Sequence, residues 1–189
     1  MIVDIGGGTT EVAVTSLGGI VLSTSLRIAG DELDDSIVSY IKKKYNILIG
    51  EVTAEMLKKK IGSVHPGVDR GVMEIRGRNL LNGLPAIITV SSAEIREAMH
   101  EQIVHIIEAI RTTLENTPPE LSSDIYDNGI MLSGGGALLG GLDALVTHVT
   151  GIRATIAKAP LDAVAIGIGH VIEGSSDSDA VQYRNRGSR

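Results

Sequence analysis

The strongest constraint on the fold is the segment VDIGGGTTEV, which spans residues 3–12. Residues 1–5 form an apolar run interrupted by Asp4, and EVAVTS and GIVLSTSLRI follow with β-branched, partly alternating patterns that predict two more strands. The glycines at 6–8 are too permissive in backbone conformation to continue a ladder, so they predict a tight turn between the first two strands. We therefore expect the chain to open with a meander of three strands.

Beyond this meander the hydrophobic pattern takes the period of a helix. Residues 29–46 place acids in the first turn and lysines in the last, which suits the helix dipole. A second helix is predicted with Thr53 as its N-cap and Gly62 as its stop. The longest helix is predicted to begin with the capping pair Ser91 and Glu94 and to end at Pro118 and Pro119.

The remaining segments predict short strands and further helices. They are a hairpin over 72–80 and 84–90, a strand over 129–133 that runs into three glycines and a helix, a strand over 152–157, and an apolar helix over 160–174. Strands and helices therefore alternate, and the sequence predicts a mixed α/β fold. The last residues, 175–189, are polar and poor in large aliphatic side chains, so we expect a disordered tail.

The composition narrows the classes of function. The 189 residues carry a formal net charge of −6 and include no Phe, no Trp and no Cys. No nucleic-acid partner is expected, because stacking aromatics and clustered basic residues are both lacking. Disulfides, thiolate metal sites and cysteine nucleophiles are excluded, which fits a reducing cytoplasm. Because no leader-like start and no apolar run near the ~20 residues of a membrane span is found, we expect a soluble protein.

The first glycine cluster has the composition of a phosphate-binding turn. Adjacent glycines let several backbone N–H groups converge on an anion, and threonine hydroxyls add donors. The candidate residues are Gly6, Gly7, Gly8, Thr9 and Thr10. Asp4, just before the turn, has the chemistry to hold Mg²⁺ through water. The alternative, a structural hairpin whose glycines only satisfy turn geometry, stays open on these residues alone.

A second glycine cluster, LSGGGALLGG at 132–141, follows a predicted strand and opens a helix. Glycines here would let a flat ligand lie against bare backbone, near the N–H groups at the start of the helix. The pattern is not a Walker loop, because Gly141 is not followed by Lys-Ser or Lys-Thr. The alternative of a simple strand-to-helix turn again stays open.

Two charged residues, Glu55 and Lys58, lie three apart on the second predicted helix. That spacing places them on one face, where both side chains can reach the same polar edge of a ligand. A solvated surface pair is the more common outcome for such spacing.

Four segments in this order, VDIGGGTTEVAV, AGDELDDSIVSYI, TAEMLKKKIG and LSGGGALLGGLDAL, closely resemble the ATPase fold shared by actin, Hsp70 chaperones and sugar kinases. The chain is most similar to the MreB-type bacterial actins, and the resemblance extends to connecting stretches such as RGRNLLNGLP and TPPELSSDI. It runs from Met1 to about Gly174. The implied fold is an actin-like, ribonuclease H-like α/β domain with an inserted smaller α+β subdomain.

The resemblance assigns roles to individual residues. It implies that the 6–10 turn grips the phosphates of ATP, that Thr9 or Thr10 presents a catalytic hydroxyl to water or the γ-phosphate, and that Asp4 acts on Mg²⁺ through water. The nucleoside would be contacted by Gly30, Glu55, Lys58, Gly134, Gly135, Gly136, Ala137 and Leu138. ATP and Mg²⁺ are thus the implied cofactors.

The resemblance also implies that this chain is only the second of two large domains. Residues 1–30 with 90–174 would form the core subdomain and residues 31–89 the inserted one. The first strand begins at Met1 without a leading turn, which fits a missing N-terminal half. The family's first phosphate loop and water-orienting acid lie in that half, so we expect the full-length protein to be the ATPase and this chain alone to be inactive.

The implied biology is that of a cytoskeletal filament that controls rod cell shape. The expected partners are further copies of the protein, the missing half and cell-shape membrane proteins, and the expected location is the cytoplasm, at the inner face of the membrane for the full-length protein. One rival is a non-catalytic interaction module without competent nucleotide binding. The other is a sugar kinase or chaperone half of the same superfamily.

Overall fold

A computed structural model describes residues 1–174. The helices are α1 (Gly30–Tyr45), α2 (Glu51–Ile61), α3 (Ser92–Glu115), α4 (Pro119–Asn128), α5 (Leu142–Thr150) and α6 (Ala163–Gly174), with a 3₁₀ helix η1 (Gly135–Leu138). The strands are β1 (Ile2–Ile5), β2 (Thr10–Ser16), β3 (Gly19–Leu26), β4 (Ile47–Leu48), β5 (Val72–Asn79), β6 (Pro85–Ser91), β7 (Ile130–Ser133) and β8 (Ala154–Ile156). The predicted tail, 175–189, lies outside the described residues.

A five-stranded sheet of order β3-β2-β1-β7-β8 forms one part of the molecule. β1, β2 and β3 pair antiparallel, as the meander predicts, whereas β1 and β7 pair parallel with Ile2 opposite Met131. β7 continues in parallel with β8. The parallel pairing matters for function, because β1 and β7 each run directly into one of the two glycine clusters.

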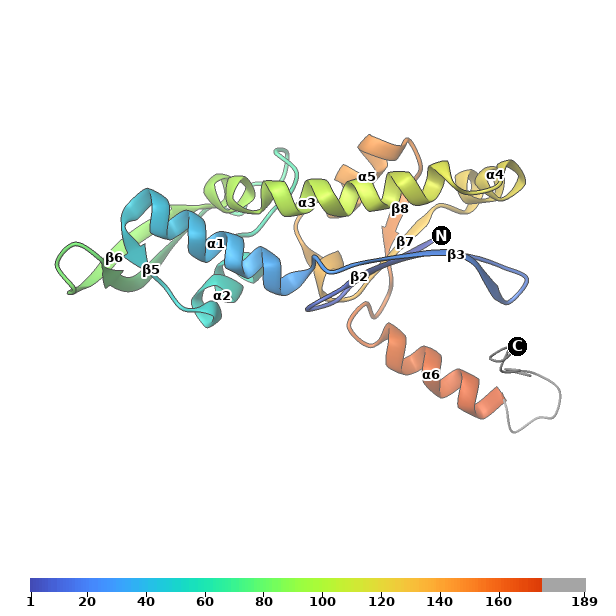
Figure 1. Cartoon of the computed structure of the whole chain (residues 1–189), viewed down its shortest axis with the longest axis horizontal. Coiled ribbons are helices and arrows are strands. Elements are labelled where there is room, and N and C mark those ends of the chain that lie inside the picture. The colour runs from blue at the N-terminus through green and yellow to red at the C-terminus, as the bar shows by residue number, and fades with distance from the viewer. Residues whose placement is uncertain (175–189) are drawn as a thin grey trace, which may run out of the picture.

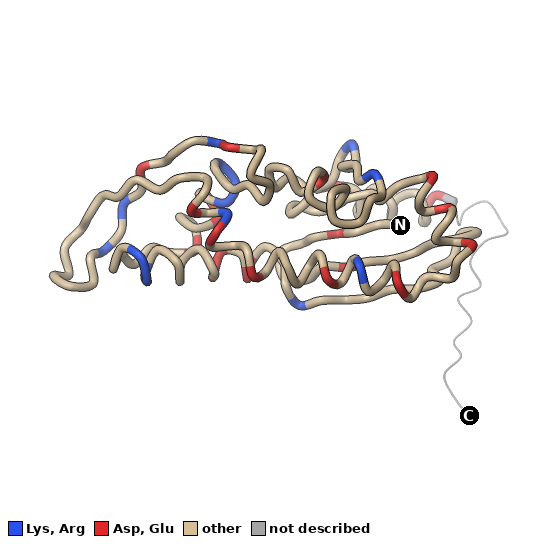
Figure 2. Tube along the Cα trace, turned by 90° about the horizontal axis from the view of Figure 1, so that it is seen from above, with Lys and Arg blue, Asp and Glu red and all other residues tan. Residues whose placement is uncertain are grey.

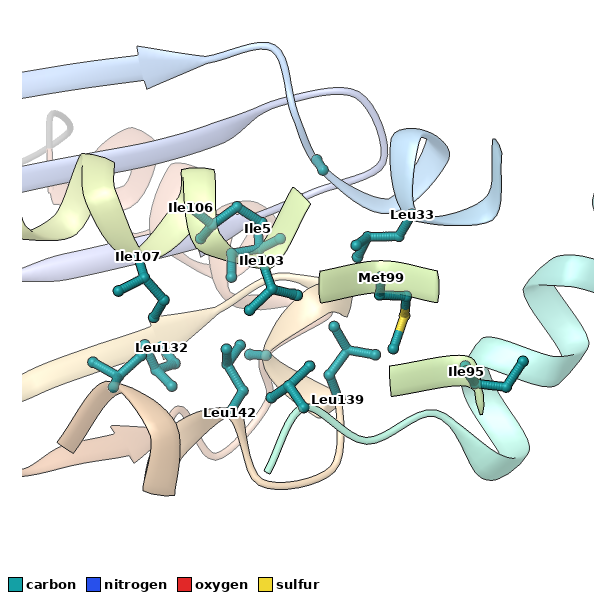
Figure 3. Packing of buried hydrophobic residues seen from close by; sticks show 14 of the residues in the cluster. Ile5, Leu33, Ile95, Met99, Ile103, Ile106, Ile107, Leu132, Leu139 and Leu142 are labelled. Atoms are coloured by element: carbon teal, nitrogen blue, oxygen red, sulfur yellow. The ribbon is translucent and has the colours of Figure 1, made fainter. Parts of the chain in front are cut away.

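α3 covers one face of this sheet along much of the length of the molecule (Figure 1). Ser91 caps the helix and accepts from the N–H of Glu94, while the Glu94 carboxylate accepts from the N–H of Ser91, so the predicted capping box is confirmed. Figure 3 shows the apolar stripe of α3 meeting side chains from β1, β7 and α5. The buried side chains along α3 and on these three elements include Ile95, Met99, Ile103, Ile106, Ile110, Ile5, Leu132 and Leu142.

A three-stranded sheet of order β4-β5-β6 forms the other part, together with α1 and α2. α1 buries Leu33, Ile37 and Ile41, and α2 buries Leu57 and others against it. β5 and β6 make the predicted hairpin. The larger sheet uses residues from both ends of the chain and the smaller sheet uses residues between them, an arrangement that supports the proposed division into 1–30 with 90–174 and an inserted 31–89.

The structure corrects several local predictions. α2 begins at Glu51 after the N-cap Gly50, three residues earlier than the predicted N-cap, so Thr53 lies inside the helix. The connector after Pro118 forms a further helix, α4, because a proline at the first helical position is pre-set for helix. The second glycine cluster forms η1 before α5 begins.

α6 differs from the other helices in its surroundings. In Figure 1 it stands below the five-stranded sheet, on the side away from α3. Its exposed apolar side chains are Val164, Ile166, Ile168, Val171 and Ile172. None of the helices described for residues 1–174 has the length and apolarity needed to cross a membrane.

Candidate functional site

A pocket of ≈ 560 Å³ lies between the two glycine clusters and the helices α1 and α2. It is lined by Gly6, Gly7, Gly30, Asp31, Leu33, Asp34, Glu55, Lys58, Lys59, Gly135, Gly136, Leu138, Leu139 and Leu161. Because β1 and β7 are parallel neighbours, their carboxyl ends bring both glycine clusters to one edge of the sheet. That edge is where open α/β sheets bind ligands.

The turn at 6–10 is held against the start of α1. The N–H of Gly30 donates to the carbonyl of Gly6 at 3.1 Å, and the N–H of Asp31 donates to the carbonyl of Gly7 at 2.8 Å. The N-cap residue Ala29 has no side-chain acceptor, so loop carbonyls take that place, while its own N–H donates to Glu32 Oε2 at 2.9 Å. Gly30 permits the approach, because a Cβ there would stand 3.2 Å from the Gly6 oxygen.

This arrangement leaves two loop amides free. In a planar trans peptide the N–H points opposite to the C=O, so the N–H groups of Gly7 and Gly8 point away from α1. Within residues 1–174 no acceptor pairs with either N–H. Successive free amides of this kind form a concavity for anions. The positive end of the α1 dipole lies behind them.

The two threonines of the turn differ in what they can reach. Thr10 is fully buried on the face of β2 that it shares with Val12 and Val14, and its hydroxyl donates to the carbonyl of Ile28 at 2.7 Å. Thr9 is exposed. Of the two, Thr9 is therefore the hydroxyl that a ligand can contact without rearrangement.

Asp4 has the feature expected of a residue that interacts with an outside cation. Its Oδ1 atom is buried and has no hydrogen-bond partner among the described residues. A buried carboxylate oxygen without a donor is costly, and a water shell around Mg²⁺ would supply one. No group of three or more His, Asp or Glu side chains within residues 1–174 is placed to hold a metal. Mg²⁺ commonly needs only one or two carboxylates when a bound phosphate supplies further ligands.

The second glycine cluster packs directly on β1. Gly134 has a φ of +78°, and a Cβ there would stand 2.3 Å from the carbonyl oxygen of Ile5. A Cβ on Gly136 would stand 2.3 Å from Cγ2 of Ile5. Gly135, Gly136 and Leu138 line the pocket, whereas Ala137 is fully buried. The second cluster thus supports the residue that precedes the first cluster.

The charged residues of α2 are paired differently from the sequence-based expectation. Lys58 does not pair with Glu55; its ammonium donates to Asp34 Oδ2 and to the Gly30 carbonyl, both at 2.7 Å. Glu55 forms an ion pair with Lys59 at 2.6 Å, and both side chains are largely exposed. All four side chains line the pocket.

Asp34 is one of the pocket residues that were not predicted from the sequence. Its side chain is buried, and burial raises its pKa although the hydrogen bond and charge of Lys58 oppose the shift. A signal was present, because Asp34 stands three residues before Ile37 and seven before Ile41, on the apolar face of α1. Asp31 was missed as well, and its carboxylate lies 3.6 Å from where a Cβ of Gly7 would be.

Comparison with known proteins agrees with this geometry. The family model described as MreB/Mbl protein matches residues 1–180. The chain belongs to the MreB/Mbl family. It is 51% identical over 173 residues to the cell shape-determining protein Mbl of Bacillus cereus and 51% identical over 173 residues to the cell shape-determining protein MreB of Escherichia coli. These alignments cover 92% of this chain in both cases, and 52% and 50% of the two relatives.

Solved MreB structures show the same fold. Spiroplasma citri MreB5 bound to AMPPNP matches with a TM-score of 0.87 and 41% identity over 93% of this chain, and the ADP-bound form matches with a TM-score of 0.88 over 94%. These alignments cover 54% and 55% of the two MreB5 chains. The double helical filament of MamK matches with a TM-score of 0.76 and 25% identity over 91% of this chain and 53% of its own. The fold is therefore that of the actin-like ATPases, and the chain spans about half the length of the MreB and Mbl relatives it matches.

Proposed function

We propose that this chain is the nucleotide-binding second half of an MreB-type bacterial actin. The observation that carries the proposal is the pocket at the ends of β1 and β7, in which two free loop amides face away from the N-terminus of α1. The structures of MreB5 bound to AMPPNP and to ADP share the fold over more than nine-tenths of this chain. We assign ATP as the ligand.

In this proposal the N–H groups of Gly7 and Gly8 bind the phosphates, and the exposed hydroxyl of Thr9 adds a donor. The nucleoside lies against the bare backbone of η1 and Gly30, near Glu55 and Lys59. Mg²⁺, when bound, would neutralise phosphate charge, and Asp4 would orient its water shell. Each of these residues binds the nucleotide or orients the water around Mg²⁺. None of them contacts the phosphates from the opposite side.

The hydrolytic site is proposed to be completed by the other half of the full-length protein. α6 supports this, since its exposed apolar side chains form a helical surface that a further domain would bury. Charge stabilisation in phosphoryl transfer comes from groups on several sides of the phosphates. We therefore propose that the full-length protein hydrolyses ATP and that this chain alone does not.

The relatives support a proposal for the cellular role. The MreB and Mbl relatives are cell shape-determining proteins, and MamK forms a double helical filament. We propose that the full-length protein polymerises in the cytoplasm, at the inner face of the membrane and with cell-shape membrane proteins as partners. Lys, Arg, Asp and Glu are interspersed along the trace in Figure 2.

The test is calorimetric titration of Mg-ATP into the 189-residue chain, together with a phosphate-release assay. Gly7→Asp should abolish binding, because it places a carboxylate beside Asp31 and the phosphates. Gly50→Asp is the matched control, because it adds the same charge at an exposed N-cap with open space. Binding by the wild type and by Gly50→Asp, without turnover, is expected.

Two outcomes would contradict the proposal. Turnover of ATP by the chain alone would show that it already contains every group needed for hydrolysis. If the wild type does not bind Mg-ATP, the chain is better described as an interaction module, which would then be tested by its binding to the other half of the full-length protein.

A further inference from the structure

A continuous line of hydrogen-bonded peptide groups connects Lys58 to the phosphate-binding turn. The Lys58 ammonium donates to the carbonyl of Gly30 at 2.7 Å. That carbonyl and the N–H of Asp31 belong to one peptide group, and this N–H donates to the carbonyl of Gly7 at 2.8 Å. The Gly7 carbonyl in turn shares its peptide group with the N–H of Gly8, which is one of the two free amides.

The direction of these bonds is the same throughout. Each peptide group accepts on its carbonyl side and donates on its N–H side, and the line begins at a positive charge. Hydrogen bonds in series polarise one another, so a cation at the start strengthens the donor at the end. Here the last donor is the N–H of Gly8, which points away from α1.

Asp34 fixes the position of the cation. Its Oδ2 atom accepts from Lys58 at 2.7 Å, and each side chain is 12% exposed. A lysine side chain has a flexible stem of four carbons, and its ammonium is strongly hydrated. Without a partner, the ammonium would therefore move out of a buried position into water. Asp34 weakens the long-range field of the ammonium, which confines its influence to the directly bonded peptide groups.

We propose that Lys58 and Asp34 are positioning residues for the phosphates of the nucleotide. Lys58 orients and polarises the amide of Gly8 through the peptide groups Gly30–Asp31 and Gly7–Gly8, and Asp34 keeps Lys58 in place. This inference rests on the proposed nucleotide site, and it gives Lys58 a role different from the sugar or base contact expected from the sequence.

The two roles make different predictions for ligands with and without phosphate. A lysine that contacts the sugar contributes equally to adenosine and to Mg-ADP. A lysine that acts on the Gly8 amide contributes to Mg-ADP alone. The ratio of the two affinities therefore distinguishes the roles, and a general loss of structure would lower both affinities together.

The experiment compares two double variants of the 189-residue chain that keep its net charge. Lys58→Met with Asp34→Asn removes the pair without leaving a buried charge, so the fold is retained. Lys60→Met with Asp35→Asn makes the same changes at exposed positions of the same two helices. Titration with Mg-ADP and with adenosine is combined with the amide NMR spectrum of the unliganded chain, in which Gly18 in the β2–β3 turn serves as a reference.

We expect the first variant to bind Mg-ADP roughly two- to fourfold more weakly, because the Gly8 amide keeps its hydrogen bond to the phosphate and loses only the polarisation, about 10–30% of that bond, with adenosine unchanged. Its Gly8 amide resonance should move while that of Gly18 does not, and the second variant should match the wild type. Equal weakening of both ligands, or an unmoved Gly8 resonance, would overturn the inference. If the wild type binds neither ligand, the proposed function fails, and the Gly8 resonance alone decides the inference.

Discussion

Gly136→Ala is the substitution whose cost the structure specifies most directly. A Cβ at this position would stand 2.3 Å from Cγ2 and 2.7 Å from Cβ of Ile5. Normal carbon contacts are about 3.5–4.0 Å, so η1 and β1 would have to separate by roughly 1 Å or more. Ile5 is 1% exposed in the packed core and has little freedom to move aside (Figure 3).

The magnitude follows from two opposing terms. Overpacking of a well-filled core costs about 1–3 kcal/mol, and a contact with both Cβ and a methyl group of a buried residue belongs near the upper end. Replacing glycine by alanine recovers about 0.4–1 kcal/mol by restricting the unfolded chain. We therefore expect Gly136→Ala to lower the free energy of unfolding by about 2 kcal/mol, which for a chain of this size is about 4–8 °C in Tm.

Gly135→Ala is the matched control, one residue away in the same 3₁₀ helix. A Cβ there meets only Cδ2 of Leu161, at 3.5 Å, which is an ordinary contact. This variant should be as stable as the wild type or slightly more stable. Urea unfolding followed by circular dichroism measures both. Equal stability of the two variants would show that β1 and η1 move apart freely, and the explanation of the second glycine cluster as a support for Ile5 would be wrong.

Three further predictions concern other parts of the molecule. Thr10→Val should destabilise the chain by about 1–3 kcal/mol in urea unfolding, because the Ile28 carbonyl loses its donor, whereas Thr9→Val should change stability little; comparable losses would contradict this. Burial raises the pKa of Glu94, but hydrogen bonds from Tyr45, Lys44 and Ser91 outweigh it and lower that pKa to about 2. This stabilisation is therefore present above pH 4.5 and lost as the pH falls towards 2, so Glu94→Gln should flatten the acid dependence of urea midpoints, and an unchanged slope would count against it. Exposed α6 should make the chain self-associate in sedimentation velocity, and Ile168→Lys should reduce this; a monomeric wild type would refute the idea.

The elements that the sequence predicted well are those fixed by local chemistry. The capping box of Ser91 and Glu94 depends on residues three apart. The long helix that follows is indicated by apolar residues that recur every three or four positions. The two glycine clusters were also recognisable, because few other residues permit such turns. The fold class followed from these elements and from the resemblance to bacterial actins.

The details that the sequence did not predict depend on distant partners. Glu55 and Lys58 have suitable spacing for a pair, yet Lys58 takes Asp34, which is 24 residues away, and Glu55 takes Lys59. Which carboxylate Lys58 pairs with depends on which side chains are buried beside it, and the spacing of residues in the sequence does not show this. The reason for a glycine at 136 is likewise an isoleucine at position 5.

The parallel pairing of β1 with β7 also bears on how the site forms during synthesis. Residues 2–4 of the chain pair with residues 131–133, so the pocket cannot exist until most of the chain has left the ribosome. Contacts of such long sequence separation form slowly, since a large loop must close before they contribute. The turn at 6–10 and the start of α1 that holds it are made early, whereas β7 and η1, which pack on β1, are made more than 100 residues later. During that interval the side of β1 that they later cover is exposed to water.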